Sequence, residues 1–232
     1  LHLAAAALGL RSFGQASQNL LAFHRTAISR EDPFYQVESL TLKARLHAYR
    51  GDLPAALATH RDLVGIAAPP RALGSHLAAH AILLAASGEA GAARTTAERA
   101  RDNGSNIEMI YFAELADAIT DDVSGDHEAF NIRAAQLVVG CNRPAYLDGL
   151  VFAYRIYPRL LGAAKLPPEA AGVLARLLVR SRDCELARSQ GVETRMDQAD
   201  EPLGGLTRRE LEVPTLLSQG LTNAEIASRL FI

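Results

Sequence analysis

Residues 77–93, LAAHAILLAASGEAGAA, carry the pattern on which the fold prediction depends. Apolar side chains in the first half recur at the three- and four-residue spacing of one helix face, at Leu77, Ala81, Leu84 and Ala85. Gly88 follows, and glycine suits the left-handed residue that ends many helices because it has no Cβ. The acidic Glu89 suits the start of a further helix, where the helix dipole favours negative charge. The stretch therefore predicts two helices joined by a tight turn.

The same turn signal recurs along the chain. Glycines stand 37 residues apart at Gly14, Gly51, Gly88 and Gly125. A polar residue follows each of them: Gln15, Asp52, Glu89 and Asp126. Alanines keep the same period, seven residues before each glycine (Ala7, Ala44, Ala81, Ala118) and four residues after three of them (Ala55, Ala92, Ala129). The pattern predicts a repeated pair of helices, with the alanines at close contacts between them.

This pattern of periodic glycines and alanines resembles the tetratricopeptide-like repeat over roughly residues 1–165. That family has small packing residues at the positions of Ala44, Ala81, Ala56 and Ala93. The period here is longer than the family's usual one, Phe130 replaces an alanine, and a fifth unit at Gly162 has Arg155 at its alanine position. The resemblance implies a superhelix with a concave binding face. The alternative is an irregular α-helical domain whose glycines coincide by chance.

Periodicity ends after a helix expected over 168–187. Residues 188–205 are polar and acidic and finish on a glycine pair, so we expect a linker there. A new unit follows at 206–232, LTRRELEVPTLLSQGLTNAEIASRLFI. It contains two capping boxes, Thr207 with Glu210 and Thr222 with Glu225, which predict two helix starts. Apolar stripes lie behind both boxes: Val213, Leu216 and Leu217, then Ile226, Ala227 and Leu230.

Two short helices joined by a glycine turn form the opening half of a helix-turn-helix. The motif Leu-Thr-x-Arg-Glu-x-Glu-Val, followed by Leu-Leu-x-Gln-Gly-Leu-Thr-Asn-x-Glu-Ile-Ala-x-Arg-Leu-Phe-Ile, resembles the C-terminal DNA-binding domain of LuxR-type bacterial transcription regulators. Pro214 departs from the family, and a proline in a helix interior costs about 3 kcal/mol, so we expect a kink. The family's recognition helix, which reads base edges, would begin after Ile232. Residues 1–232 alone are therefore expected to bind DNA weakly.

The resemblance implies which residues approach the DNA backbone. Thr222 and Asn223 stand at the start of the second helix and are expected near a phosphate. Arg208 and Arg209 are candidate backbone contacts, although a solvated helix start is the favoured interpretation for both. Glu210 and Glu225 are expected to act as helix caps together with the two threonines, rather than as DNA-contacting groups.

No catalytic or metal site is expected. His76 and His80 have a zinc-like spacing but no third ligand, which favours a packed or solvent-facing pair, and His60 and His127 stand alone. Lys43 and Lys165 lack the neighbours of a phosphate-binding loop. We therefore expect no enzyme and no cofactor in this segment. In the large, ATP-binding LuxR-type regulators that resemble MalT, the ATP site would lie before Leu1.

Composition sets wider limits. The chain has 232 residues, 49% of them apolar and 6% aromatic, and alanine and leucine outnumber β-branched residues, which favours an all-α fold. A net charge of −2 excludes a nucleic-acid-binding protein that is basic along its whole length. Apolar runs are too short to span a membrane. Cys141 and Cys184 are isolated, so a reducing cytoplasm is expected.

The sequence is thus interpreted as part of a cytoplasmic LuxR-type regulator. A tetratricopeptide-like repeat domain over 1–187 is followed by a linker over 188–205 and by a partial helix-turn-helix domain over 206–232. Expected partners are DNA, a protein or small-molecule effector on the repeat superhelix and, as one arrangement, a second copy of the chain. No membrane partner is expected. The alternative is a helical-repeat scaffold for protein partners with a non-functional C-terminal remnant.

Overall fold

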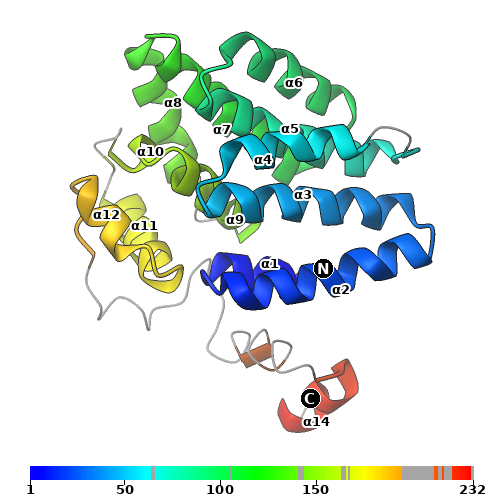
Figure 1. Cartoon of the computed structure of the whole chain (residues 1–232). Coiled ribbons are helices and arrows are strands. Elements are labelled where there is room, and N and C mark those ends of the chain that lie inside the picture. Colours follow the sequence, from blue (N-terminus) through cyan, green and yellow to red (C-terminus); the bar gives the residue numbers. More distant parts are fainter. Residues whose placement is uncertain are drawn as a thin grey trace.

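The computed structural model describes residues 1–63, 66–104, 106–140, 144–162, 166, 168–194, 212–213, 216 and 221–230. Within these residues the fold is all-α, without a strand, which confirms the predicted class (Figure 1). No helix in the described part is long and apolar enough to cross a membrane. The domain limits at 187 and 205 stay predictions.

The helices follow one another with short turns. In chain order they are α1 (His2–Gly9), α2 (Phe13–Ser29), α3 (Pro33–Tyr49), α4 (Leu53–Ala58), the 3-10 helix η1 (Thr59–Leu63), α5 (Pro70–Ala86), α6 (Ala90–Asp102), α7 (Ile107–Val123), α8 (His127–Gly140), α9 (Pro144–Ile156), α10 (Arg159–Gly162), α11 (Pro168–Arg180), α12 (Cys184–Ser189) and α14 (Asn223–Leu230). Helices α3, α5, α7 and α9 begin 37 residues apart. The tetratricopeptide-like type of this repetition stays a prediction.

Six turns between these helices share one backbone geometry. The second residue after the first helix has a positive φ, and the next helix begins two residues later; the six residues are Arg11, Glu31, Gly51, Gly88, Gly125 and Arg182. The amide after this residue donates to the carbonyl five residues earlier, as from Glu89 N to Leu84 O at 2.9 Å. This Schellman bond satisfies a carbonyl at the helix end. The predicted role of the periodic glycines is confirmed for three of them.

The prediction is wrong for Gly14. This glycine lies in the first turn of α2, and Arg11 takes the left-handed position instead. At some of the six turns the next residue caps the following helix with its side chain: Asp52 Oδ1 accepts from Ala55 N at 3.0 Å, and Asp126 Oδ1 accepts from Ala129 N at 3.0 Å. Glu89, at the start of α6, makes no such bond.

Only one of the two alanine columns lies between packed helices. Ala7, Ala44, Ala81 and Ala118 are buried, as the predicted close contacts require. Of the second column, Ala92 is exposed and Ala55 and Ala129 are half-buried, because its members stand in the first turn of the second helices. The buried positions lie one residue later, at Ala56, Ala93 and Phe130.

The fifth unit departs from the pattern. Helix α9 begins 37 residues after α7, as the pattern requires, but it ends at Ile156. Gly162 is the last residue of the short α10 and does not have a positive φ. The single helix expected over 168–187 is instead two helices, α11 and α12, separated by Arg182 with φ 61°. Residues 188 and 189 belong to α12 rather than to the expected linker.

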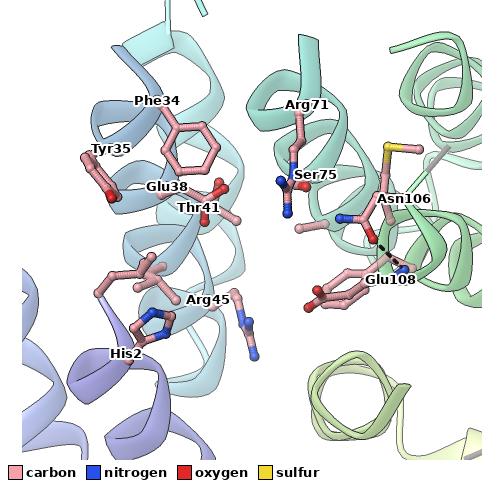
Figure 2. Close-up of a pocket in the computed structure, with 15 residues that line it drawn as sticks. His2, Phe34, Tyr35, Glu38, Thr41, Arg45, Arg71, Ser75, Asn106 and Glu108 are labelled. Carbon is pink, nitrogen blue, oxygen red and sulfur yellow. Dashed lines mark hydrogen bonds between the residues drawn. The ribbon is translucent and has the colours of Figure 1, made fainter. Parts of the chain in front are cut away.

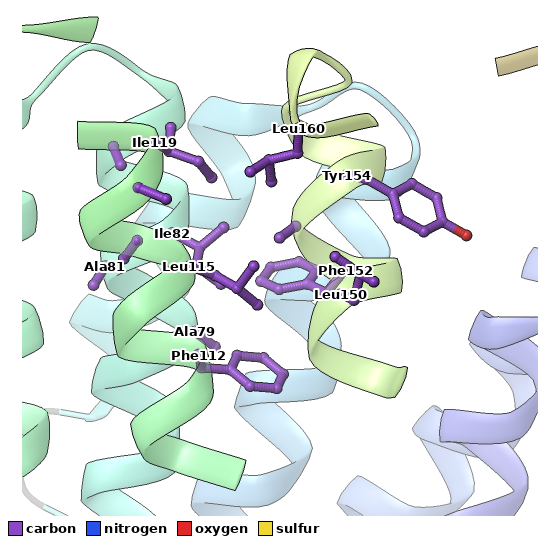
Figure 3. Packing of buried hydrophobic residues seen from close by; sticks show 14 of the residues in the cluster. Ala79, Ala81, Ile82, Phe112, Leu115, Ile119, Leu150, Phe152, Tyr154 and Leu160 are labelled. Atoms are coloured by element: carbon purple, nitrogen blue, oxygen red, sulfur yellow. The ribbon is translucent and has the colours of Figure 1, made fainter. Parts of the chain in front are cut away.

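Helix α9 packs against α3, α5 and α7 together. Its Phe152 is fully buried, with ring centroids 5.8 Å from Tyr49 of α3 and 6.0 Å from Phe112 of α7. Figure 3 shows the Phe152 ring turned toward α7, beside Leu115. The inner side of these helices is thus partly filled by α9 rather than open along its whole length.

Arg155 joins the two ends of this helical body. Its guanidinium lies 2.9 Å from Asp183 Oδ2 and donates to the carbonyls of Leu8 and Gly9 at 2.8 Å each. Asp183 also accepts from Arg11 and from Tyr154 Oη. The arginine at the expected alanine position therefore ties the end of α1 to the turn between α11 and α12.

The turn geometry predicts opposite effects for two glycines of the same helix pair. A Cβ at either Gly88 or Gly91 meets no atom within 4 Å, so only the backbone differs. Gly88 has φ 88°, so Gly88→Ala should lower the free energy of unfolding by about 1–2 kcal/mol. Gly91 lies inside α6, so Gly91→Ala should raise it by up to about 1 kcal/mol. Urea unfolding measures both, and equal effects would contradict the assignment.

Candidate functional site

The C-terminal segment contains a complete helix start. The backbone amide and the hydroxyl of Thr222 both donate to Glu225 Oε2 at 2.7 Å, and Glu225 N donates to Thr222 Oγ1 at 3.4 Å. These are the reciprocal bonds of the expected capping box. The bonds from Thr222 hold the pKa of the Glu225 carboxyl below its ordinary value. Glu225 is therefore a charged cap at the beginning of α14.

A small apolar cluster lies under this helix. Leu216, Ile226 and Leu230 are buried against one another, and Val213 and Leu221 pack on them. All of these except Leu221 belong to the two predicted stripes, so the two stripes pack against each other. Ala227 of the second stripe is half-buried. Glu212, Val213 and Leu216 are helical, as expected for the first helix. The other stripe residue of that helix, Leu217, lies outside the described residues.

Thr222 and Asn223 are exposed at the N-terminus of α14. Their position agrees with the expected approach to a phosphate, which stays a prediction. The remaining predicted residues of the segment, Thr207, Arg208, Arg209, Glu210 and Pro214, lie outside the described residues, and so does any kink at the proline.

Comparison with known proteins identifies this segment. Residues 205–232 match the GerE family, described as bacterial regulatory proteins, luxR family. The match supports a LuxR-type regulator, which agrees with the resemblance seen in residues 206–232. It covers the C-terminal segment and leaves the helical repeats untested. Neither the curated proteins nor the solved structures gave a match.

A second candidate site is a cleft of about 380 Å³ at the beginnings of α3, α5 and α7. Sequence analysis did not find it, because its walls come from three repeats and from α1. Figure 2 shows Glu38 of α3 and Glu108 of α7 on opposite sides, with Arg71 of α5 between them. The other main lining residues are Leu1, His2, Phe34, Tyr35, Thr41, Arg45, Ser75, Met109 and Phe112.

Arg45 forms the inner wall of the cleft. It is buried, donates to both oxygens of Asp148 of α9 at 2.7 and 2.6 Å, and lies over the Phe152 ring at 5.1 Å. Burial alone would raise the pKa of Asp148, but the bidentate Arg45 holds it below its ordinary value. This charged pair joins α3 to α9.

Both glutamates of the cleft, Glu38 and Glu108, have a raised pKa, so their surroundings disfavour the charged form. Burial raises the pKa of Glu38, and the charge of Glu108 raises it further. Burial and the charge of Asp148 raise the pKa of Glu108. Arg45 and Arg71 oppose both shifts without reversing them. The cleft therefore favours a positive charge near the two glutamates.

The histidines pack more closely than their spacing predicts. His76 and His80 are buried, and His60 of η1 stacks on His80 with ring centroids 4.3 Å apart. His60 Nδ1 lies 3.2 Å from His76 Nε2, so the prediction that His60 stands alone is wrong. His127 is not alone either, because its Nδ1 lies 2.6 Å from Asp122 Oδ1. Among the described residues, no group of three His, Cys, Asp or Glu side chains is arranged to hold a metal ion.

The buried histidines predict loss of stability in acid. Burial and the neighbouring histidines lower the pKa of His76 to about 3, and burial and His60 lower that of His80 to about 4, from 6.5. The unfolded chain therefore binds more protons. The contribution of these histidines is complete above about pH 6.5. It should fall below that pH, down to about pH 4 for His80 and about pH 3 for His76, by up to about 1.4 kcal/mol per pH unit for each histidine.

Urea unfolding at several pH values tests this dependence. His80→Gln removes one titrating group and should flatten the profile, whereas His2→Gln, at an exposed position, should leave it unchanged. A profile with the same slope in His80→Gln and the wild type would show that the assignment is wrong.

Proposed function

We propose that this chain is a DNA-binding transcription regulator of the LuxR type, whose helical-repeat part receives a signal and controls the C-terminal domain. The family match over residues 205–232 is the observation that carries the proposal. The exposed N-terminus of α14 supports it, since amides and small polar side chains at such a position contact DNA phosphates in helix-turn-helix proteins. A cytoplasmic location and a homodimer belong to the same proposal. It assigns no enzymatic step to the chain.

The order of the parts favours one type within this class. An all-α body of helix pairs precedes the LuxR-type segment, which is the arrangement of the large, MalT-like regulators that the sequence resembles. We extend the proposal to that type and to a tetratricopeptide-like repeat. The 37-residue spacing of α3, α5, α7 and α9 supports the repeat.

Helix α1 offers a physical connection between the cleft and the C-terminal side. Leu1 and His2 line the cleft at one end of α1. At its other end the Leu8 and Gly9 carbonyls accept from Arg155, and the adjacent Arg11 pairs with Asp183 just before α12. A change at the cleft that moves α1 would therefore act on the helix pair that leads to the DNA-binding segment.

The DNA-binding role predicts a charge effect at Asn223. Asn223→Asp places a negative charge in the first turn of α14, where the dipole favours it, so the helix should keep its stability. The same charge repels a DNA phosphate. In the full-length protein that the gene encodes, Asn223→Asp should lower DNA affinity several-fold. It should also reduce the slope of log affinity against log salt concentration by the equivalent of about one phosphate contact.

The DNA probes are chromosome fragments that the wild-type protein retains. Fluorescence anisotropy measures the affinity of each variant for these fragments. Gln18→Glu is the matched control, since it adds the same charge at an exposed position of α2. Equal affinities of Asn223→Asp and Gln18→Glu would contradict the phosphate contact. Absence of any retained DNA would favour the scaffold function instead.

The signal-receiving role predicts an effect of Arg11. Arg11→Ala breaks the ion pair with Asp183 while leaving α14 unchanged. Promoters occupied by the protein should keep their occupancy and lose their response to growth conditions. Arg25→Ala removes the same charge from an exposed position of α2 and should behave as the wild type. Occupancy and transcript sequencing measure both quantities, and an unchanged response in Arg11→Ala would refute the coupling through α1.

A further inference from the structure

Three histidine rings stack where η1 meets α5. The ring centroid of His60 in η1 lies 4.3 Å from that of His80 and 5.4 Å from that of His76, and the ring planes are 12° and 15° from parallel. His76 and His80 are buried on α5. Neither the C-terminal segment nor the cleft at the beginnings of α3, α5 and α7 uses these three rings.

A chain of hydrogen bonds fixes the tautomers of two of the rings. The hydroxyl of Thr41 in α3 donates to the carbonyl of Val37 at 3.0 Å, so it accepts from His76 Nδ1, which lies 2.9 Å away. Neutral His76 then has its lone pair on Nε2. His60 Nδ1 lies 3.2 Å from that atom and donates to it. The chain of bonds is therefore complete when the rings are neutral.

The stack has room for one proton at most. A proton on Nε2 of His60 leaves the bond to His76 in place, whereas a proton on Nε2 of His76 turns two N–H groups toward each other. A second charged ring would lie between 4.3 and 6.1 Å from the first. Among the described residues, no carboxylate lies within ion-pair distance of the three rings to offset that repulsion.

The charged groups around the stack disfavour protonation as well. Arg45 of α3 lines the small void beside His76 and His80. Burial and the charge of Arg99 in α6 lower the pKa of His60. Helix α4 contributes no charged side chain. The remaining charged side chains nearby are Arg61, Asp62 paired with Lys43 of α3 at 3.1 Å, and Glu89.

Helix η1 is the weakly held side of this contact. It is a five-residue 3-10 helix, and 3-10 hydrogen bonds are less well aligned than those of an α-helix. Of its residues only Thr59 is buried, and it packs mainly against α3 and α4. The pair of Lys43 and Asp62 is exposed and adds little. Elements with few buried contacts open locally before the whole domain unfolds.

We propose that the three histidines form a proton-sensitive joint, which holds η1 on α5 while the rings are neutral and releases η1 when more than one proton binds. Release places His60 in water and uncovers His76 and His80, so that all three rings can be charged. Each opening therefore takes up two further protons. The joint makes mild acid a stimulus for the helical body, and this last step rests on the signal-receiving role proposed above.

The direction of the effect follows from the protons that each form binds. In the closed joint the pKa of His76 is about 3 and that of His80 about 4, whereas released rings titrate near the ordinary value of 6.5. Below that value the released form binds more protons and is favoured. From pH 7.5 to 5.5 the ratio of released to closed η1 should rise about tenfold for each proton, hence about a hundredfold for two.

Native-state hydrogen exchange of the 232-residue chain measures this opening. After correction for the intrinsic pH dependence of amide exchange, the opening of residues 59–63 should increase about a hundredfold from pH 7.5 to 5.5. Local release exposes little surface, so exchange in η1 should not respond to low urea concentrations, whereas exchange in α7 should. An increase below about tenfold, or the same urea dependence in η1 and α7, would overturn the proposal.

A double variant keeps aromatic rings in the stack and removes two sites of protonation. His60→Phe/His80→Phe should reduce the hundredfold increase to about tenfold or less, because only His76 can still take up a proton. His2→Phe, at an exposed position, should keep the full increase. A hundredfold increase in the double variant would show that other groups take up the protons and that the joint is wrong.

The tautomers provide a test that needs no variant. Long-range correlation spectra between ring protons and ring nitrogens, recorded at pH 7.5, should place the proton on Nδ1 in both His60 and His76. A proton on Nε2 of His76 would contradict the chain of hydrogen bonds and with it the joint.

The joint and its role as a signal can fail separately. Neither outcome bears on DNA binding, which is measured on Asn223→Asp. If η1 opens as expected, but the wild type and His60→Phe/His80→Phe give the same transcript response to mild acid in cells, the joint stands and acid is not the signal.

Discussion

The left-handed residue between consecutive helices is the constraint on which this architecture depends. It reverses the chain within three residues and lets the following amide return to the last turn of the helix before it. Because the same turn occurs six times among the described residues, neighbouring helices meet in similar ways and their starts keep a fixed period. Glycine fills this position at Gly51, Gly88 and Gly125. At Arg11, Glu31 and Arg182 a residue with a Cβ adopts it at some conformational cost, offset by the packing of the helices on either side.

Two arginine–aspartate ion pairs then fix how the helix pairs pack together, and this packing defines the inner cleft. Arg45 and Asp148 join α3 to α9, which places α9 against the inner side of α3, α5 and α7. Arg155 and Asp183 join α1 to the turn before α12. Buried pairs of this kind cost desolvation, so their main contribution is to select one arrangement of the helices rather than to add stability. The cleft and the C-terminal side of the body consequently share α1 as a common element.

Much of the local structure could be predicted from the sequence. The helix that ends before Gly88, the caps at Asp52 and Asp126, and the box formed by Thr222 and Glu225 all depend on residues a few positions apart. Local hydrogen bonds and backbone preferences decide such features, and these preferences belong to the residue types themselves. The errors came where packing overrides local preference. Gly14 looked like a turn residue, yet its position in α2 needs no positive φ, and the first-turn alanines looked like packing residues although the buried position lies one residue later.

The sequence by itself determined the all-α class, the spacing of the helix pairs and the LuxR-type character of the C-terminal segment. Each of these depends on residues that lie close together along the chain. Tertiary structure decided the closure by α9, the stacking of His60 on His80 and the convergence of Glu38, Arg71 and Glu108 on one cleft. These features join residues that lie between 20 positions (His60 and His80) and 103 positions (Arg45 and Asp148) apart, and no local preference encodes such a distance. They exist only once buried side chains have fixed the angle at which each helix crosses the next.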